Sequence, residues 1–133
     1  MMKMKNPIEK AKSKAENAKS ILKENGMLDE AINHYQNKKY VRKAGRMLWR
    51  AVLIALDAVY DVRMDRRTKV YIDDYLHAIA KQDQSLAVVV DNGYNVIHVY
   101  MAYDGCQHKP ISDEGFRLAN DIIDRCDKML SFE

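Results

Sequence analysis

One histidine lies in an apolar, tyrosine-rich stretch of the sequence, YNVIHVYMAYDG, which covers residues 94–105. His98 follows Tyr94 by four positions and precedes Met101 by three, so a helix would place it at the edge of an apolar face. An imidazole can accept and donate protons near neutral pH, which suits general acid/base catalysis. The alternative is a buried neutral histidine bonded to a neighbouring carbonyl, hydroxyl or amide. We favour this second interpretation, and the candidates for lining a common pocket are Tyr94, Asn95, His98 and Tyr103.

A second pattern that could do chemistry is a run of basic residues spaced by four, three and four, namely Lys39, Lys43, Arg46 and Arg50. On a helix this spacing forms one ridge, which could bind the phosphates of a nucleic acid. Tyr40 and Trp49 lie near the ridge and could stack on bases. In the alternative, which we favour because Arg46 and Arg50 approach the apolar segment 51–56, the ridge is a solvated face that pairs with acidic later helices. Arg46 and Arg50 would then be partly buried in ion pairs, with Asp57 as a candidate partner.

The charge of the chain is divided unevenly between its two halves. Residues 1–70 carry seventeen Lys and Arg against eight Asp and Glu, a net charge of +9, whereas residues 71–133 carry five against eleven, a net charge of −6. A basic half could face nucleic acid or another polyanion. Alternatively the two halves could complement each other within a bundle or across a dimer, and we favour this second interpretation.

Metal and cofactor motifs are absent from the sequence. None of the four histidines is followed by another at three or four positions, and neither cysteine, Cys106 or Cys126, belongs to a CxxC pair. The nearest approach to a metal site is Asp73, Asp74 and His77, which we interpret as a solvated helix start. Glycine-rich phosphate loops and GxSxG nucleophile motifs are absent as well. We therefore predict that the protein uses no metal and no cofactor.

The 133 residues predict one domain that spans residues 1–133 and is long enough to bury a core. The basic start has no apolar segment of a secretory signal, and the longest apolar run, AVLIAL, is too short for a membrane span. These features predict a cytoplasmic protein with reduced thiols and no membrane contact.

Apolar periodicity and capping residues predict an all-α fold, an antiparallel bundle of four to five helices. The expected helices cover residues 7–25, 38–62, 72 or 73 to about 80–83, 84–103, and 112 onward. Residues 27–37 are predicted to be mostly connection, and the basic segment DVRMDRRTK at 61–69 is predicted to be a loop.

Several residues should shape these helices. Asn6 is the expected N-cap of the first helix, and Gly26 is expected to end it in a left-handed conformation. Ser112 is the expected N-cap of the last helix, and Gly105 should end the helix before it. Residues 51–56 are apolar on every side, so they must belong to a central helix or to a dimer interface. Gly93 lies inside a helix, which suggests close contact with another helix there.

Four segments together resemble a known family. They are NPIEKAKSKAENAKSIL (6–22), KKYVRKAGRMLWRAVLIALDAV (38–59), IDDYLHAIA (72–80) and YNVIHVYMAYDG (94–105). They look like a small uncharacterised bacterial family, a domain of unknown function with a HEPN-like helical bundle. The resemblance implies a HEPN-like fold and a homodimer. HEPN proteins include metal-independent ribonucleases and nonenzymatic partners of small nucleotidyltransferases.

The ribonucleases of that superfamily carry an arginine, then four to six residues, then a histidine. Here the positions five, six and seven before His98 hold Gly93, Asn92 and Asp91, so the motif is absent. We therefore predict a noncatalytic HEPN-like module that binds nucleic acid, a nucleotide or a nucleotidyltransferase-like partner. One alternative is a metal-independent ribonuclease in which His98 works with an arginine from another helix. The other is a structural homodimeric interaction protein without a ligand.

Overall fold

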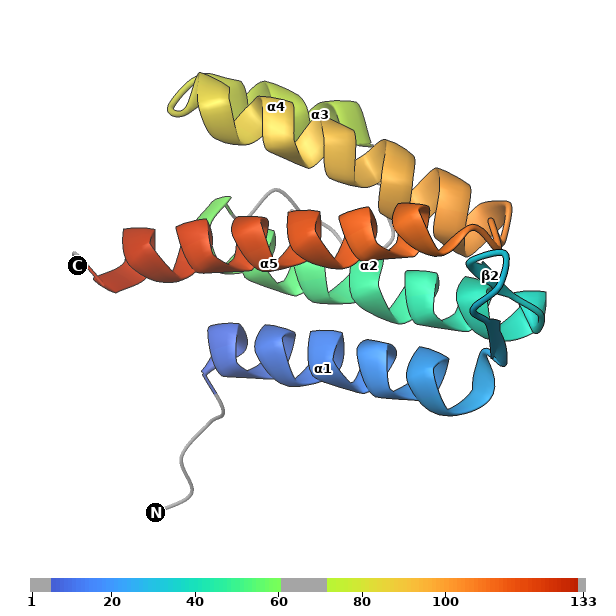
Figure 1. The fold of residues 1–133 in the computed structure, drawn as a ribbon. Coiled ribbons are helices and arrows are strands. Elements are labelled where there is room, and N and C mark those ends of the chain that lie inside the picture. Colours follow the sequence, from blue (N-terminus) through green and yellow to red (C-terminus); the bar gives the residue numbers. More distant parts are fainter. Residues whose placement is uncertain (1–5, 61–71, 132–133) are drawn as a thin grey trace, which may run out of the picture.

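The computed structural model describes residues 6–60 and 72–131, which are almost entirely helical (Figure 1). This confirms the predicted all-α bundle. The predicted loop at 61–69 lies outside the described residues. The elements are α1 (Pro7–Asn25), β1 (Leu28–Asp29), β2 (His34–Tyr35), α2 (Lys38–Tyr60), α3 (Ile72–Ala80), α4 (Gln84–Gly93), η1 (Tyr94–Tyr103) and α5 (Lys109–Ser131).

Helix α2 is the centre of the bundle, because α1, α5, η1 and α3 all contact it. In Figure 1 α1 and α5 lie along it, and the long element formed by α4 and η1 crosses above them with α3 beside α4. Within the apolar segment 51–56, Ala51, Val52, Ala55 and Leu56 are fully buried. A helix that is apolar all round needs neighbours on several sides, and these neighbours cover most of the segment within one chain, with Leu53 and Ile54 partly buried. The central-helix interpretation of residues 51–56 is therefore confirmed.

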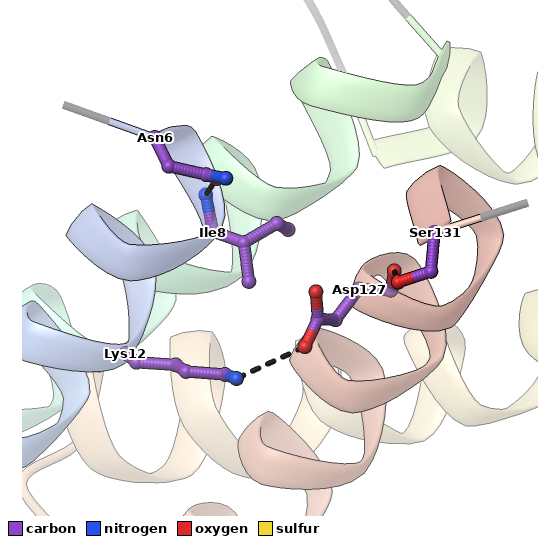
Figure 2. Close-up of polar contacts among 5 residues, drawn as sticks. All are labelled: Asn6, Ile8, Lys12, Asp127 and Ser131. Atoms are coloured by element: carbon purple, nitrogen blue, oxygen red, sulfur yellow. Dashed lines mark hydrogen bonds and ion pairs between the residues drawn. The ribbon is translucent and has the colours of Figure 1, made fainter. Parts of the chain in front are cut away.

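The start of α1 is capped as predicted. The side-chain Oδ1 of Asn6 accepts a hydrogen bond of 2.8 Å from the backbone N–H of Ile8 (Figure 2). Pro7 occupies the first helical position. Proline is well suited there, because its missing N–H would have no partner within the helix. From this start, Ile8, Ala11, Ala15, Ala18 and Leu22 form the buried face of α1.

Replacing Asn6 by alanine should lower the free energy of unfolding by about 1 kcal/mol, because a helix N-terminal N–H loses its acceptor. Aspartate at this position keeps an acceptor and adds a favourable charge at the N-terminus, so Asn6→Asp should stay within about 0.5 kcal/mol of the parent. Urea denaturation followed by circular dichroism measures both. Equal losses in the two variants would contradict a capping role for Asn6.

The prediction that Gly26 is left-handed is wrong. Gly26 has a right-handed conformation with φ −72°, and the next residue, Met27, has φ 57°. The reason for a glycine is space rather than conformation. A Cβ on Gly26 would lie 2.6 Å from the carbonyl O of Leu22 and 2.7 Å from Cδ1 of Tyr35. The chain therefore needs glycine at the position where the Tyr35 ring closes over the end of α1.

The predicted connection at 27–37 contains a small hairpin. Leu28 pairs with Tyr35 and Asp29 with His34 in an antiparallel register. Strand β2 also bonds to the segment before α5, since the N–H of Tyr35 donates to the carbonyl O of Gln107 at 2.8 Å. These bonds fix the connection between α1 and α2 against the start of α5.

The predicted helix at 84–103 is continuous but changes its hydrogen-bond pattern at Tyr94. Residues 94–103 form a π-helix, in which each N–H bonds to the carbonyl five residues earlier, and the N–H of Asp104 continues this pattern to Val99 at 2.9 Å. Leu86, Val90, Ile97 and Met101 are fully buried and form the apolar face of this continuous element. Gly105 ends the element with φ +65°, as predicted.

Helix α5 begins at Lys109, three residues earlier than predicted, with Pro110 inside its first turn. Ser112 is therefore not the N-cap. It is fully buried, and its Oγ has no hydrogen-bond partner among the described residues. The acid that follows it, Asp113, binds the Lys109 side chain at 2.8 Å. This ion pair and the backbone bonds to the hairpin account for the earlier start.

The two cysteines have different environments. Cys126 is fully buried on α5, and burial raises the pKa of its thiol to about 12, whereas Cys106 is half-buried in the segment after η1. At about pH 8 we expect Ellman's reagent to modify Cys106 at least ~100-fold faster than Cys126, since only the thiolate reacts. Unfolding in guanidinium should equalise the two rates. Equal rates in the folded protein would contradict the burial of Cys126.

Candidate nucleic-acid interface on α2

The basic ridge of α2, defined as Lys39, Lys43, Arg46 and Arg50, is exposed along its whole length. None of the four side chains forms an ion pair with a described residue. The expectation that Arg46 and Arg50 are partly buried in ion pairs is therefore wrong. Asp57, their candidate partner, instead accepts a hydrogen bond of 2.8 Å from the Tyr75 hydroxyl, which directs it toward α3.

A pocket of about 220 Å³ lies between this ridge and α1, and its lining residues are Lys14, Lys43, Arg46, Met47 and Arg50. Lys14 was not among the sequence candidates. Its position is explained by the small residues beside it, since Ala11 and Ala15 are buried on the α1 face and let α1 approach α2 closely. Lys14 follows Ala11 by three positions, at the edge of this face. The spacing of Lys14 from Ala11 could be read from the sequence, but the sequence did not show that α2 would pack against this face of α1.

Four cations around one pocket repel each other unless an anion lies between them. The described carboxylates of the acidic half do not supply one, since none of them pairs with these four cations. Of the ion pairs between described residues, three lie within α5, namely Lys109–Asp113, Arg117–Glu114 and Arg125–Asp121. Only Lys12–Asp127, at 3.0 Å, joins the basic half to the acidic half, and it is exposed (Figure 2). Among residues 6–60 and 72–131, this surface contact is the one ion pair between the two halves, and the ridge is left available for an external anion.

An aromatic cluster borders the ridge on the side of η1. The rings of Tyr94 and His98 are stacked with centroids 5.1 Å apart, and Trp49 lies 5.7 Å from Tyr94 and 5.8 Å from His98. Trp49 is buried, precedes Arg50 directly and follows Arg46 by three positions. His98 is exposed, which corrects the expectation of a buried, hydrogen-bonded histidine. The cluster therefore places an accessible imidazole and a half-buried tyrosine against Trp49, the residue that directly precedes Arg50 on α2.

The other two pocket candidates do not join this cluster. Asn95 is exposed, and its side-chain amide donates to the carbonyl O of Asp91 at 3.2 Å within the same helix. Tyr103 is 77% exposed at the end of η1. Both pockets that we describe are lined by other residues. The structure thus brings together Tyr94 and His98 of the four candidates.

Among residues 6–60 and 72–131, no group of three or more His, Cys, Asp or Glu side chains is arranged to hold a metal ion. Asp73 and His77 are exposed on α3. The sequence did not predict that His34 and His108 lie close together. The bridge between β2 and the segment before α5 brings their rings to 5.7 Å in an edge-on arrangement. Within the described ranges, every helix is too short or too polar to cross a membrane.

Comparison with known proteins finds both a family and solved structures that are similar to this chain. A family model described as a domain of unknown function (DUF5618) matches residues 6–128. A solved structure of a protein of unknown function from Dyadobacter fermentans is 32% identical, with a TM-score of 0.81 over 93% of this chain and 95% of that chain. No curated protein matches the chain. The resemblance to an uncharacterised domain family is thereby confirmed, whereas the relation to HEPN proteins stays a prediction.

Proposed function

The chain belongs to the family described as a domain of unknown function (DUF5618), and we propose that it is a noncatalytic module that binds single-stranded nucleic acid along α2. The observation that carries this proposal is the exposed basic ridge, whose side chains have no carboxylate partner among the described residues. Lys14 adds a further cation across the pocket from Lys43, Arg46 and Arg50. Phosphates would supply the anions that this surface lacks.

The dimensions of the ridge support a strand rather than a single anion. Lys39 and Arg50 are eleven residues apart, which corresponds to about 17 Å along the helix axis at 1.5 Å per residue. A ridge of this length contacts several successive phosphates. On its η1 side, the exposed ring of His98, stacked on Tyr94, offers a surface on which an unpaired base could stack. Duplexes keep their bases stacked inside, so a single strand makes better use of this cluster.

The test is a titration of labelled single-stranded RNA and DNA of about 20 nucleotides, followed by fluorescence anisotropy at increasing KCl. If four cations each neutralise one phosphate of a single strand, the logarithm of the binding constant should fall with log[KCl] at a slope of about −3. A duplex of the same sequence should bind more weakly. Failure to bind any of the three nucleic acids at low salt, or a slope near zero, would remove the proposal.

A second candidate is metal-independent cleavage of RNA, and the exposure of His98 favours it. Its ring lies 5.8 Å from that of Trp49, and Trp49 adjoins Arg50 on α2. An imidazole could then move a proton while a guanidinium stabilises the charge on the phosphate. Cleavage of single-stranded RNA in EDTA that is lost in His98→Ala, with binding retained, would support it. Intact RNA after long incubation with the parent would reject it.

The homodimer and the nucleotidyltransferase-like partner stay predictions. A nucleotide is a smaller ligand that the pocket between α1 and α2 could also hold, because its phosphates would meet the same four cations. The titration can be repeated with unlabelled competitors of the labelled RNA. If a free nucleotide competes as strongly as an unlabelled 20-nucleotide strand, the result favours a nucleotide as the ligand.

A further inference from the structure

A second pocket lies at the opposite edge of α1, where the hairpin and α5 meet. Its volume is about 350 Å³, which is within the usual range for small-molecule sites. Leu22 of α1, Leu28 and Tyr35 of the hairpin, and Phe116 of α5 form its apolar walls. Leu22 is nearly completely buried, while Leu28 and Phe116 are partly exposed against the core. The pocket therefore offers an apolar space for a body of about one ring or a short branched chain.

The polar groups around this pocket are mostly cationic. Lys19 and Lys23 are one turn apart on α1, both exposed, and neither forms an ion pair with a described residue. Lys109 is already neutralised, since Asp113 binds it at 2.8 Å and 3.1 Å through its two carboxylate oxygens. This hydrogen bond also raises the pKa of Lys109, so the pair stays ionised. Two uncompensated positive charges therefore stand at the rim.

Tyr35 supplies a polar group on the wall. Its side chain is 8% exposed, and its hydroxyl makes no hydrogen bond with any residue that the structure describes. The hydroxyl oxygen is accessible, unlike the fully buried Oγ of Ser112, so it can donate a hydrogen bond to a ligand in the pocket. Burial raises the pKa of Tyr35, so the hydroxyl keeps its proton and remains a donor at neutral pH. Backbone bonds of β2 to Leu28 and Gln107 hold this residue in place, so the donor position is fixed before a ligand enters.

We propose that this pocket binds a small amphipathic organic acid, with its apolar body between Leu28 and Phe116 and its carboxylate at Lys19 and Lys23. The Tyr35 hydroxyl donates a hydrogen bond to the same ligand. An uncharged apolar ligand would leave both lysines without a partner, and an inorganic anion would leave the apolar walls in water. The combination of the two kinds of lining favours a molecule that has both parts. This site is separate from the basic ridge of α2 and does not depend on nucleic-acid binding.

The probe is phenylacetate, with phenylacetamide as its neutral match, titrated into ¹⁵N-labelled full-length protein. We expect phenylacetate to give saturable amide shifts around residues 19–23, 35 and 113–116, with a dissociation constant of about 0.1–1 mM for so small a ligand. The amide should bind at least about fivefold more weakly. The double variant Lys19→Met/Lys23→Met keeps the aliphatic stems and should weaken phenylacetate about tenfold.

Lys10→Met is the matched control, because Lys10 is exposed on α1 but does not line this pocket. It should leave the dissociation constant unchanged within about twofold. Three results would overturn the proposal: no saturable shift up to about 10 mM, equal binding of acid and amide, or shifts that map to the ridge of α2 instead. Because the lysines are exposed, their replacement does not threaten folding, and the unchanged spectrum of each variant verifies this.

Discussion

Replacing Gly45 by alanine should destabilise the bundle by about 2–3 kcal/mol, although alanine is the better helix former by about 1 kcal/mol. A Cβ at this position of α2 would lie 2.5 Å from the backbone N of Ala102, 2.8 Å from its Cα and 2.8 Å from Cβ of Met101. These atoms belong to η1, and two of them are backbone, so no side-chain rotation relieves the contact. The central helix and η1 would have to separate.

Gly93→Ala is the matched control, since it makes the same change in another buried helical glycine. The new Cβ would lie 3.2 Å from Cδ1 of Ile122, the mobile end of a side chain that can move by a few tenths of an ångström. The gain in helix propensity should then nearly offset the contact, and the free energy of unfolding should change by less than about 1 kcal/mol. Urea denaturation followed by circular dichroism measures both variants. Equal destabilisation would mean that the approach of α2 to η1 is not specially close.

The two glycines also show where sequence reasoning stops. Gly93 was expected to mark close contact between helices because a glycine inside a helix is costly. It is buried toward Ile122, but the tightest backbone approach is at Gly45. Periodicity tells which face of a helix is buried, whereas the distance to the neighbouring backbone depends on how two helices cross. The distance between two helix backbones is therefore determined by the residues of both helices, and one helix alone does not predict it.

Helix ends were likewise predictable where local interactions determine them, and not where contacts with other elements do. Asn6 and Gly105 act through local bonds and backbone conformation, so their roles could be predicted. Gly26 and Ser112 were misassigned because Tyr35 and the bonds between the hairpin and α5 decide the geometry there. The π-helical hydrogen bonds of residues 94–103 had no sequence signal, since their apolar spacing also suits an α-helix.

For the candidate interface, the four ridge residues could be predicted because they share one helix and its period. Lys14 could not, because it reaches the ridge only through the packing of α1 on α2. His98 was placed correctly beside Tyr94, but its exposure depends on how η1 meets Trp49. Residues on one element were thus predictable from spacing, and residues brought together from several elements were not.

Reversing three charges of the ridge, in Lys43→Glu/Arg46→Glu/Arg50→Glu, should weaken binding of single-stranded RNA by at least about 100-fold at ~100 mM KCl. All three side chains are exposed and line the pocket with Lys14, so their loss removes phosphate contacts and adds repulsion without disturbing the core. The slope of log affinity against log[KCl] should also fall in magnitude by about 2. With three phosphate contacts fewer, the binding of RNA releases fewer counterions. Anisotropy titrations at several salt concentrations measure both quantities.

The control has the same change in net charge at other exposed positions, Lys19→Glu/Lys23→Glu/Lys81→Glu. If net charge alone attracts RNA, both triple variants lose affinity equally, and the assignment to α2 is wrong. If phosphates bind at the ridge, the control loses less than about tenfold and keeps its salt slope, because long-range attraction is screened beyond about 10 Å at this salt concentration. The salt slope decides between the two, because it counts local contacts, whereas the loss of affinity combines local contacts with the field of the whole molecule.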